Sequence, residues 1–143
     1  MPIFLANSAY DLVTHPITLV SLGSVVGGNL RYYLGRWIDQ QGWPWGFPWG
    51  TLVINVSGSF LLGFLAIIFL ERLLPPRREL YLLLGTGFCG GYTTFSTFEW
   101  ETYKLIREQN YLAAGGNIFL SVLLGLIGVI AGVLLALSIF GRR

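Results

Sequence analysis

Four long apolar stretches, separated by short polar connections, make up most of the chain. They cover residues 17–38, 50–70, 80–100 and 113–140. Each stretch is long enough for a helix that crosses a bilayer, which takes roughly 20 residues. The connections contain turn-forming prolines and most of the charged side chains. The pattern therefore predicts an all-α membrane protein in which residues 1–143 form a single domain of four transmembrane helices.

The third stretch contains a segment that is unsuited to a continuous, lipid-facing helix: GTGFCGGYTTFSTF, from Gly85 to Phe98. Glycines crowd its first half and hydroxyl side chains its second half. Non-helical backbone at membrane depth is tolerated where it is buried in protein or lines a wet cavity. We therefore predict that the third helix is broken here, at a binding or transport site. The alternative is an unbroken, glycine-rich helix that packs closely on a neighbour.

The composition agrees with a membrane protein and narrows the range of partners. Hydrophobic residues make up 54% of the chain and charged residues only 11%, which is too apolar for an ordinary water-soluble domain. The basic residues are scattered and the formal net charge is only +2, so nothing favours nucleic acid as a partner. We expect the chain to be surrounded by membrane lipid.

The basic residues are divided almost equally between the two ends of the predicted helices. Five lie at the end that carries the termini, and four at the other end. The two sets are Arg72, Arg77, Arg78, Arg142 and Arg143, against Arg31, Arg36, Lys104 and Arg107. A fixed orientation normally shows a clear cytoplasmic excess of Lys and Arg. We therefore predict dual topology, in which two copies of opposite orientation form an antiparallel homodimer.

The interior of the predicted spans holds hydrogen-bond donors and phenylalanine rings but no carboxylate. Proton-coupled transporters and cation pumps usually keep ionisable residues at this depth, so both classes are disfavoured. Asn55 carries two N–H donors, and Phe95 and Phe98 share one helical face with electropositive ring edges. Donors and ring edges suit an anion that must lose its water. The alternative for Asn55 is to join two helices by hydrogen bonds.

Polar residues in the first and last spans extend this pattern. Asn117, Ser121 and Gly125 follow one another at steps of four residues on one face of the last span. Arg31 lies about two thirds of the way along the first span. One interpretation is that its side chain snorkels to the nearer interface. The other is that it lines a vestibule that gathers anions.

Three segments resemble the CrcB/Fluc family of fluoride channels: GNLRYYLGR in the first span, GTLVINVSGSFLLG in the second, and GTGFCGGYTTFSTF in the third. The similarity runs over nearly the whole chain from about Gly28 onward. It implies a fluoride-selective channel, not an enzyme, that exports fluoride passively across the cell (inner) membrane of a microbe and protects against fluoride toxicity. It also implies a dual-topology homodimer with two antiparallel pores, each lined by helices from both subunits.

The resemblance also implies roles for single residues. Arg31 matches an arginine near the vestibule, and Gly90 and Thr93 match residues whose backbone carbonyls hold a structural sodium ion at the dimer interface. The residues that match the fluoride pore are Asn55, Phe95, Ser96, Thr97, Phe98, Asn117 and Ser121. The chain departs from the family pattern in its last span, where Asn117 replaces a tyrosine and Gly125 replaces a hydroxyl of some members.

Two rival functions fit the length and the number of spans. A small dual-topology multidrug exporter needs a glutamate embedded in the membrane, and the predicted spans have none in their interior. A non-transporting membrane subunit would use the glycine faces only to bind a larger partner. That function would leave the donors and the broken third helix without a purpose.

Overall fold

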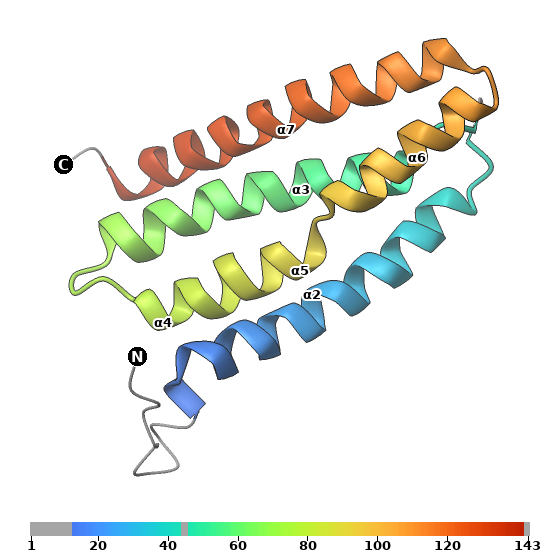
Figure 1. Ribbon diagram of the computed structural model, residues 1–143. Helices are drawn as coiled ribbons and strands as arrows, with labels where there is room; N and C mark the ends of the chain where they lie inside the picture. The colour runs from blue at the N-terminus through green and yellow to red at the C-terminus, as the bar shows by residue number, and fades with distance from the viewer. Residues whose placement is uncertain (1–12, 44–45, 142–143) are drawn as a thin grey trace, which may run out of the picture.

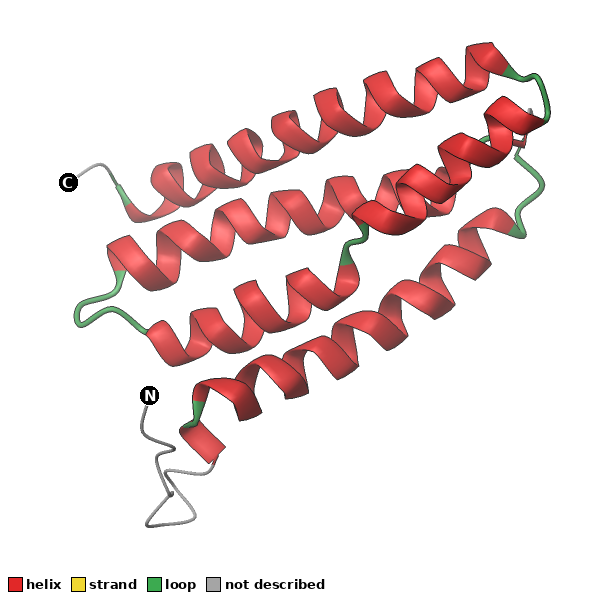
Figure 2. Ribbon diagram, viewed as in Figure 1, coloured by secondary structure: helices red, strands yellow, loops and turns green. Residues whose placement is uncertain are grey.

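The computed structural model describes residues 13–43 and 46–141, and all regular structure within them is helical (Figure 2). Arg142 and Arg143, which belong to the charge count at one end, lie outside the described residues. The first helix, α2, runs over Pro16–Asp39. The Ile17 N–H donates to Nδ1 of His15 at 3.3 Å and so caps its start, and proline suits the first turn because that turn needs no N–H donor.

The second and last helices are the most apolar. Helix α3 covers Trp49–Ala66 and continues as a π-helical turn over Ile67–Arg72, and α7 covers Tyr111–Phe140. Among the described residues, these two helices are long and apolar enough to cross a membrane. The outward face of α7 carries exposed apolar side chains such as Phe119, which suits contact with lipid.

The third helix consists of two segments that are offset from each other. Its first segment joins α4 (Arg78–Leu80), a π-helical stretch (Tyr81–Cys89) and α5 (Gly90–Tyr92). After Thr93 and Thr94, α6 runs over Phe95–Arg107. Figure 1 shows α6 displaced sideways from the line of α5. The interruption therefore falls inside the segment that the sequence singles out.

The helices form one bundle with two ends. Figure 1 shows α7, α3, the first segment of the third helix and α2 side by side, with the start of α2, the end of α7 and the connection from α3 to α4 at one end. The connections from α2 to α3 and from α6 to α7 lie at the other end. At that end Oδ1 of Asp39 accepts from the backbone N–H of Gly50 at 2.9 Å, which ties the end of α2 to the start of α3.

Glycines allow two pairs of helices to pack backbone against backbone. A Cβ on Gly23 or Gly27 of α2 would meet the carbonyl oxygens of Leu83 and Phe88 in the third helix. In the opposite direction, a Cβ on Gly91 would meet the carbonyl of Ser24 at 2.6 Å. Both interpretations of the glycine-rich segment therefore hold in part, because its glycines pack closely on α2 and its hydroxyl residues coincide with the interruption.

Helices α3 and α7 pack in the same way. A Cβ on Gly128 would lie 2.9 Å from the carbonyl oxygen of Val56, and a Cβ on Gly132 would meet the carbonyl oxygen of Phe60. These contacts involve backbone atoms, which move only if the helices separate. The space between α3 and α7 is thus set by glycine.

We expect Gly132→Ala to destabilise the protein by about 1–3 kcal/mol, the usual cost of overpacking a filled interior. The matched control is Gly115→Ala on the same helix, where a Cβ would have nothing within 4 Å. The measurement is the apparent midpoint of thermal unfolding in detergent, followed by circular dichroism. Equal midpoints for the two variants would show that α3 and α7 do not depend on this close approach.

Candidate functional site

The interruption of the third helix is held by one side chain of α3. Thr93 and Thr94 both have extended backbone, with φ and ψ of −86° and 160° for Thr93 and −153° and 119° for Thr94. The Thr94 N–H donates to Oδ1 of Asn55 at 2.8 Å, and Nδ2 of Asn55 donates to the Thr94 carbonyl at 3.0 Å. The asparagine thus satisfies both backbone groups of a residue that has left the helix, as a low-dielectric surrounding requires.

The hydroxyls of the interruption close the ends of the two segments. Oγ1 of Thr94 accepts from the Thr97 N–H at 3.2 Å and caps α6. The same hydroxyl donates to Oγ1 of Thr97 at 3.0 Å and lies 3.4 Å from Oγ of Ser96. Thr93 instead donates its hydroxyl to the Cys89 carbonyl at 2.9 Å. The tight turn between two helices explains why hydroxyl residues cluster at this point of the sequence.

Two hollows have Thr94 as a common lining residue. The first, called here the polar hollow after its amide and hydroxyl groups although most of its lining surface is apolar, has a volume of about 260 Å³, and the second, the charged hollow, has about 290 Å³. The polar hollow is lined by residues that include Asn55, Ser59, Thr94, Phe95, Phe98 and Ser121. The charged hollow is lined by residues that include Arg31, Arg36, Asp39, Thr94, Thr97 and Glu101. The residue clamped by Asn55 therefore forms part of the wall of both.

The two phenylalanines differ in their surroundings although they share one helical face. Their ring centroids lie 5.5 Å apart with 45° between the planes. Phe98 is 8% exposed, whereas Phe95 is 69% exposed. Phe98 is therefore enclosed within the chain's own helices, and Phe95 projects from them.

Asn117 lies behind the polar hollow and is 0% exposed. Its Nδ2 donates to Oγ1 of Thr102 at 2.8 Å, and its Oδ1 accepts from the Ser121 hydroxyl at 3.3 Å. Thr102 in turn donates its hydroxyl to the carbonyl of Phe98 at 2.8 Å. Of the two polar residues predicted for the pore in the last span, Ser121 contributes to the wall of the polar hollow and Asn117 supports it from behind.

Sequence reasoning missed two residues of α6. Neither is among the residues singled out in the sequence, yet Thr102 is buried and bonded to Asn117 of α7, and Glu101 lines the charged hollow. The spacing contained a signal for Thr102, since it follows Phe98 by one helical turn and so shares its face.

Burial raises the pKa of the Glu101 carboxyl, as does the charge of Asp39, while a hydrogen bond from Thr51 and the charge of Lys104 lower it.

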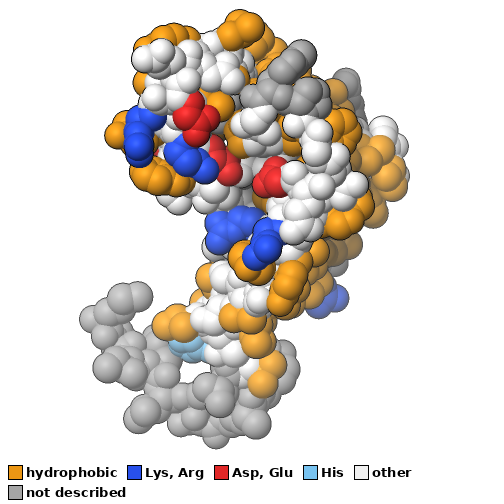
Figure 3. Space-filling model, turned by 90° about the vertical axis from the view of Figure 1, so that its right-hand side faces the viewer, with side chains coloured by type: hydrophobic (Ala, Val, Ile, Leu, Met, Phe, Trp, Pro, Cys, Tyr) orange, Lys and Arg blue, Asp and Glu red, His pale blue; other side chains and the backbone are white. Residues whose placement is uncertain are grey.

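The charged hollow opens at the end of the bundle where charges of both signs gather (Figure 3). Arg31 is half-buried in its wall. Nη1 of Arg36 donates to the Tyr32 hydroxyl at 2.8 Å.

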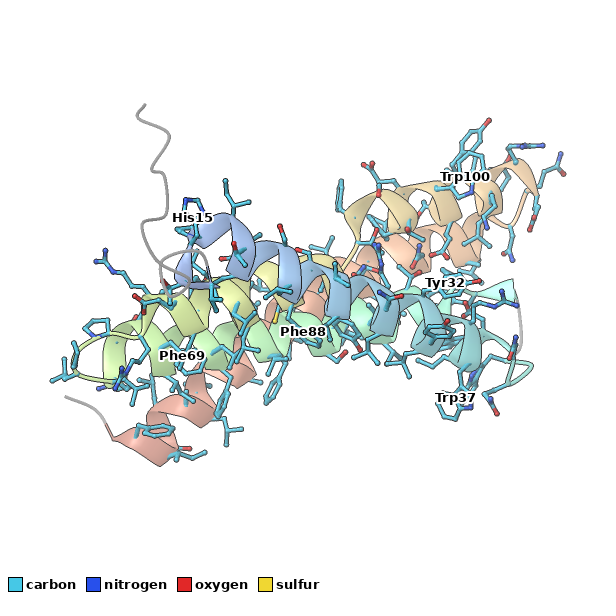
Figure 4. The ribbon with its side chains drawn as sticks, turned by 90° about the horizontal axis from the view of Figure 1, so that it is seen from below. His15, Tyr32, Trp37, Phe69, Phe88 and Trp100 are labelled. Atoms are coloured by element: carbon cyan, nitrogen blue, oxygen red, sulfur yellow. The ribbon has the colours of Figure 1, made fainter. Side chains whose placement is uncertain are left out.

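Figure 4 shows that Tyr32, Trp37 and Trp100 lie at this end, while Phe88 lies midway along the bundle and His15 lies toward the opposite end. Aromatic rings at helix ends are typical of a membrane interface.

The interruption also leaves backbone carbonyls without their helical donors. In an unbroken helix the Thr94 N–H would donate to the carbonyl of Gly90, but here it donates to Asn55. Gly90 itself is exposed, and a Cβ there would meet nothing within 4 Å. No cluster of three or more His, Cys, Asp or Glu side chains suited to a metal occurs in the described part of the chain.

Comparison with known proteins agrees with the resemblance of the three motifs. The family model for CrcB-like protein, Camphor Resistance (CrcB), matches residues 18–133. The fluoride-specific ion channel FluC of Oceanobacillus iheyensis is 46% identical over 121 residues, which cover 85% of this chain and 91% of the relative. The channels of the same name from Pyrococcus furiosus and Trichormus variabilis are 47% and 42% identical, over 84% and 86% of this chain and 94% and 88% of their own lengths. The chain therefore belongs to the CrcB/FluC family of fluoride-specific ion channels.

Proposed function

We propose that the chain forms a channel through which fluoride leaves the cell passively, which protects the cell against fluoride toxicity. The observation that carries this proposal is the polar hollow at the interrupted helix, where donors and a phenylalanine pair meet without a carboxylate in the wall. A membrane channel of a fluoride-specific family needs a dry, narrow path that replaces the water around a small anion. The polar hollow has the required chemistry.

The route runs from the charged hollow to the polar hollow. Arg31 and Arg36 supply the positive charges that an entering anion meets in the charged hollow, whose wall also contains the carboxyl groups of Asp39 and Glu101. Thr94 lines both hollows, Thr97 lines the charged hollow, and Ser96 lies beside them on the first turn of α6. Beyond them, the second proton of the Asn55 amide, the Ser121 hydroxyl and the ring edges of Phe95 and Phe98 replace the water around fluoride.

The channel is an antiparallel homodimer in the cell (inner) membrane. Phe95 projects from the protomer with 69% of its surface exposed, so a second copy is needed to enclose it. The nearly equal numbers of basic residues at the two ends of the helices allow the chain to insert in both orientations. Two copies in opposite orientation then form two pores, each lined by both subunits.

A sodium ion at the dimer interface completes the assembly. The carbonyl oxygens of Gly90 and Thr93 would hold it, and they fit because the interruption removes the helical donor of the Gly90 carbonyl. Hard cations take oxygen ligands of this kind. When bound, sodium supplies a fixed positive charge that joins the two subunits.

Replacing either phenylalanine of the pair by isoleucine should slow fluoride efflux about tenfold, the effect of raising a barrier by 1.4 kcal/mol. The reason is that Phe95→Ile and Phe98→Ile keep an apolar side chain but remove the electropositive ring edge. The matched control, Phe119→Ile, changes an exposed ring on α7. Efflux from liposomes is read with a fluoride electrode and repeated with chloride inside. Efflux at the wild-type rate in both pore variants would remove the rings from the mechanism, and failure of the wild-type protein to release fluoride would remove the proposed function.

Adding several lysines to the C-terminus should lock the orientation of the chain and abolish fluoride efflux, because all copies would then insert the same way. A tail of the same length made of glutamine and serine is the control. Production together with a chain locked in the opposite orientation should restore efflux. Full activity of the single-orientation protein by itself would contradict the antiparallel pair.

Replacing sodium on both sides by N-methyl-D-glucamine should strongly reduce fluoride efflux if a carbonyl-bound sodium holds the dimer in its working form. Dimer content is measured in parallel by cross-linking, since loss of the ion need not separate the subunits. Fluoride efflux that does not depend on sodium would exclude this ion.

A further inference from the structure

The hydrogen bonds around Asn117 have a fixed direction. A hydroxyl group has one proton, and the proton of Thr102 is donated to the Phe98 carbonyl. Oγ1 of Thr102 is therefore an acceptor toward Asn117, so the amide must present Nδ2 to Thr102 and Oδ1 to Ser121. The orientation of a fully buried amide on α7 thus follows from one hydroxyl on α6.

This direction determines what Ser121 offers to the polar hollow. Its single proton is donated to Oδ1 of Asn117. Its oxygen, which contributes to the wall of the polar hollow, therefore presents lone pairs. An anion that takes the Ser121 proton must first compete with the amide oxygen, and the hydroxyl must turn from Asn117 to the anion without breaking its O–H bond.

The competing bond is weak enough to be exchanged. The Ser121–Asn117 distance is 3.3 Å, longer than the 2.7–2.8 Å typical of hydroxyl donors. The two other bonds of the series are both 2.8 Å. A hydrogen bond to an anion is about twice as strong as one between neutral groups, so the Ser121 hydroxyl donates to fluoride when fluoride is present. The binding free energy that fluoride gains is smaller than it would be from a hydroxyl with no other acceptor.

We propose that Asn117, oriented by Thr102, weakens the binding of the permeating anion at Ser121 and so lets it leave. This inference rests on the proposed function, since conduction needs binding that is strong enough for entry and weak enough for exit. Asn117 is then a positioning residue. It acts on the ion through the hydrogen bond that it accepts from Ser121. Neither Asn117 nor Thr102 contacts the ion directly.

Two substitutions release the Ser121 proton by different chemistry. Thr102→Val keeps the volume and removes the hydroxyl that orients the amide, so that Asn117 can turn Nδ2 toward Ser121. Asn117→Leu keeps the branching of the side chain and removes the acceptor. Both variants should lower the fluoride concentration that gives half-maximal current about fivefold, the worth of one neutral hydrogen bond, and both should lower the maximal current because exit becomes slower.

Two further variants should act in the opposite direction. Asn117→Asp places a charged acceptor that holds the Ser121 proton more strongly, and Ser121→Ala removes the donor, so each should raise the half-saturating concentration. In the Ser121→Ala background, Thr102→Val and Asn117→Leu should have no further effect. The matched control is Ser138→Ala on the same helix, whose exposed hydroxyl donates to the Leu135 carbonyl at 2.8 Å; it should leave the current unchanged.

The measurement is fluoride current across planar bilayers as a function of fluoride concentration, with size-exclusion profiles to confirm that each variant is folded. A purely structural role would move all variants in the same direction, and a change that persists in the Ser121→Ala background would also overturn the inference. Wild-type current with equal half-saturating concentrations in all variants would remove only this inference. Absence of fluoride current in the wild-type protein would remove the proposed function together with it.

Discussion

The paired hydrogen bonds between the Asn55 amide and the backbone of Thr94 are the interaction on which the site depends. A backbone N–H and carbonyl that leave a helix inside a membrane cost several kcal/mol each unless they find partners. Asn55 supplies both partners from the neighbouring helix, with distances of 2.8 and 3.0 Å. The clamp fixes the extended backbone at Thr94, the residue whose hydroxyl caps α6 and which lines both hollows.

The glycine contacts provide the frame in which the clamp works. Helix α2 is held against the first segment of the third helix, and α3 against α7, by backbones in direct contact. Asn55 then crosses from one of these pairs to the other, because α3 carries the amide and the third helix carries Thr94. The interruption and the polar hollow therefore lie where two tightly packed pairs of helices meet.

Much of this arrangement could be predicted from the sequence, because hydrophobic length and glycine content act locally. Four helices followed from the lengths of the apolar stretches, and the region of the interruption followed from glycines and hydroxyls in a span with no other reason to hold them. The two interpretations of Asn55, a join between helices and a donor for an anion, are compatible in the structure. The Asn55 amide bonds to the backbone N–H and carbonyl of Thr94, and the same residue also lines the polar hollow.

The parts that could not be predicted depend on contacts between helices. Helical periodicity cannot tell which side of α6 meets a neighbouring helix, so the sequence did not point to Thr102 or Glu101. In the same way, the step of four residues placed Asn117 and Ser121 on one face, but only the packing of α6 on α7 puts Asn117 behind Ser121. Whether a residue lines the hollow or lies behind the lining residue depends on how the helices pack, and the spacing of residues in the sequence does not show it.

The interruption of the third helix also creates two electrical poles. The peptide dipoles of a helix leave partial positive charge at its start and partial negative charge at its end. Helix α6 starts at Phe95, beside the polar hollow, whereas α5 ends at Tyr92 on the other side of the turn. A single interrupted helix thus offers an anion-attracting end and a cation-attracting end within a few residues of each other, without any ionisable side chain, so this part of the attraction for ions does not change with pH.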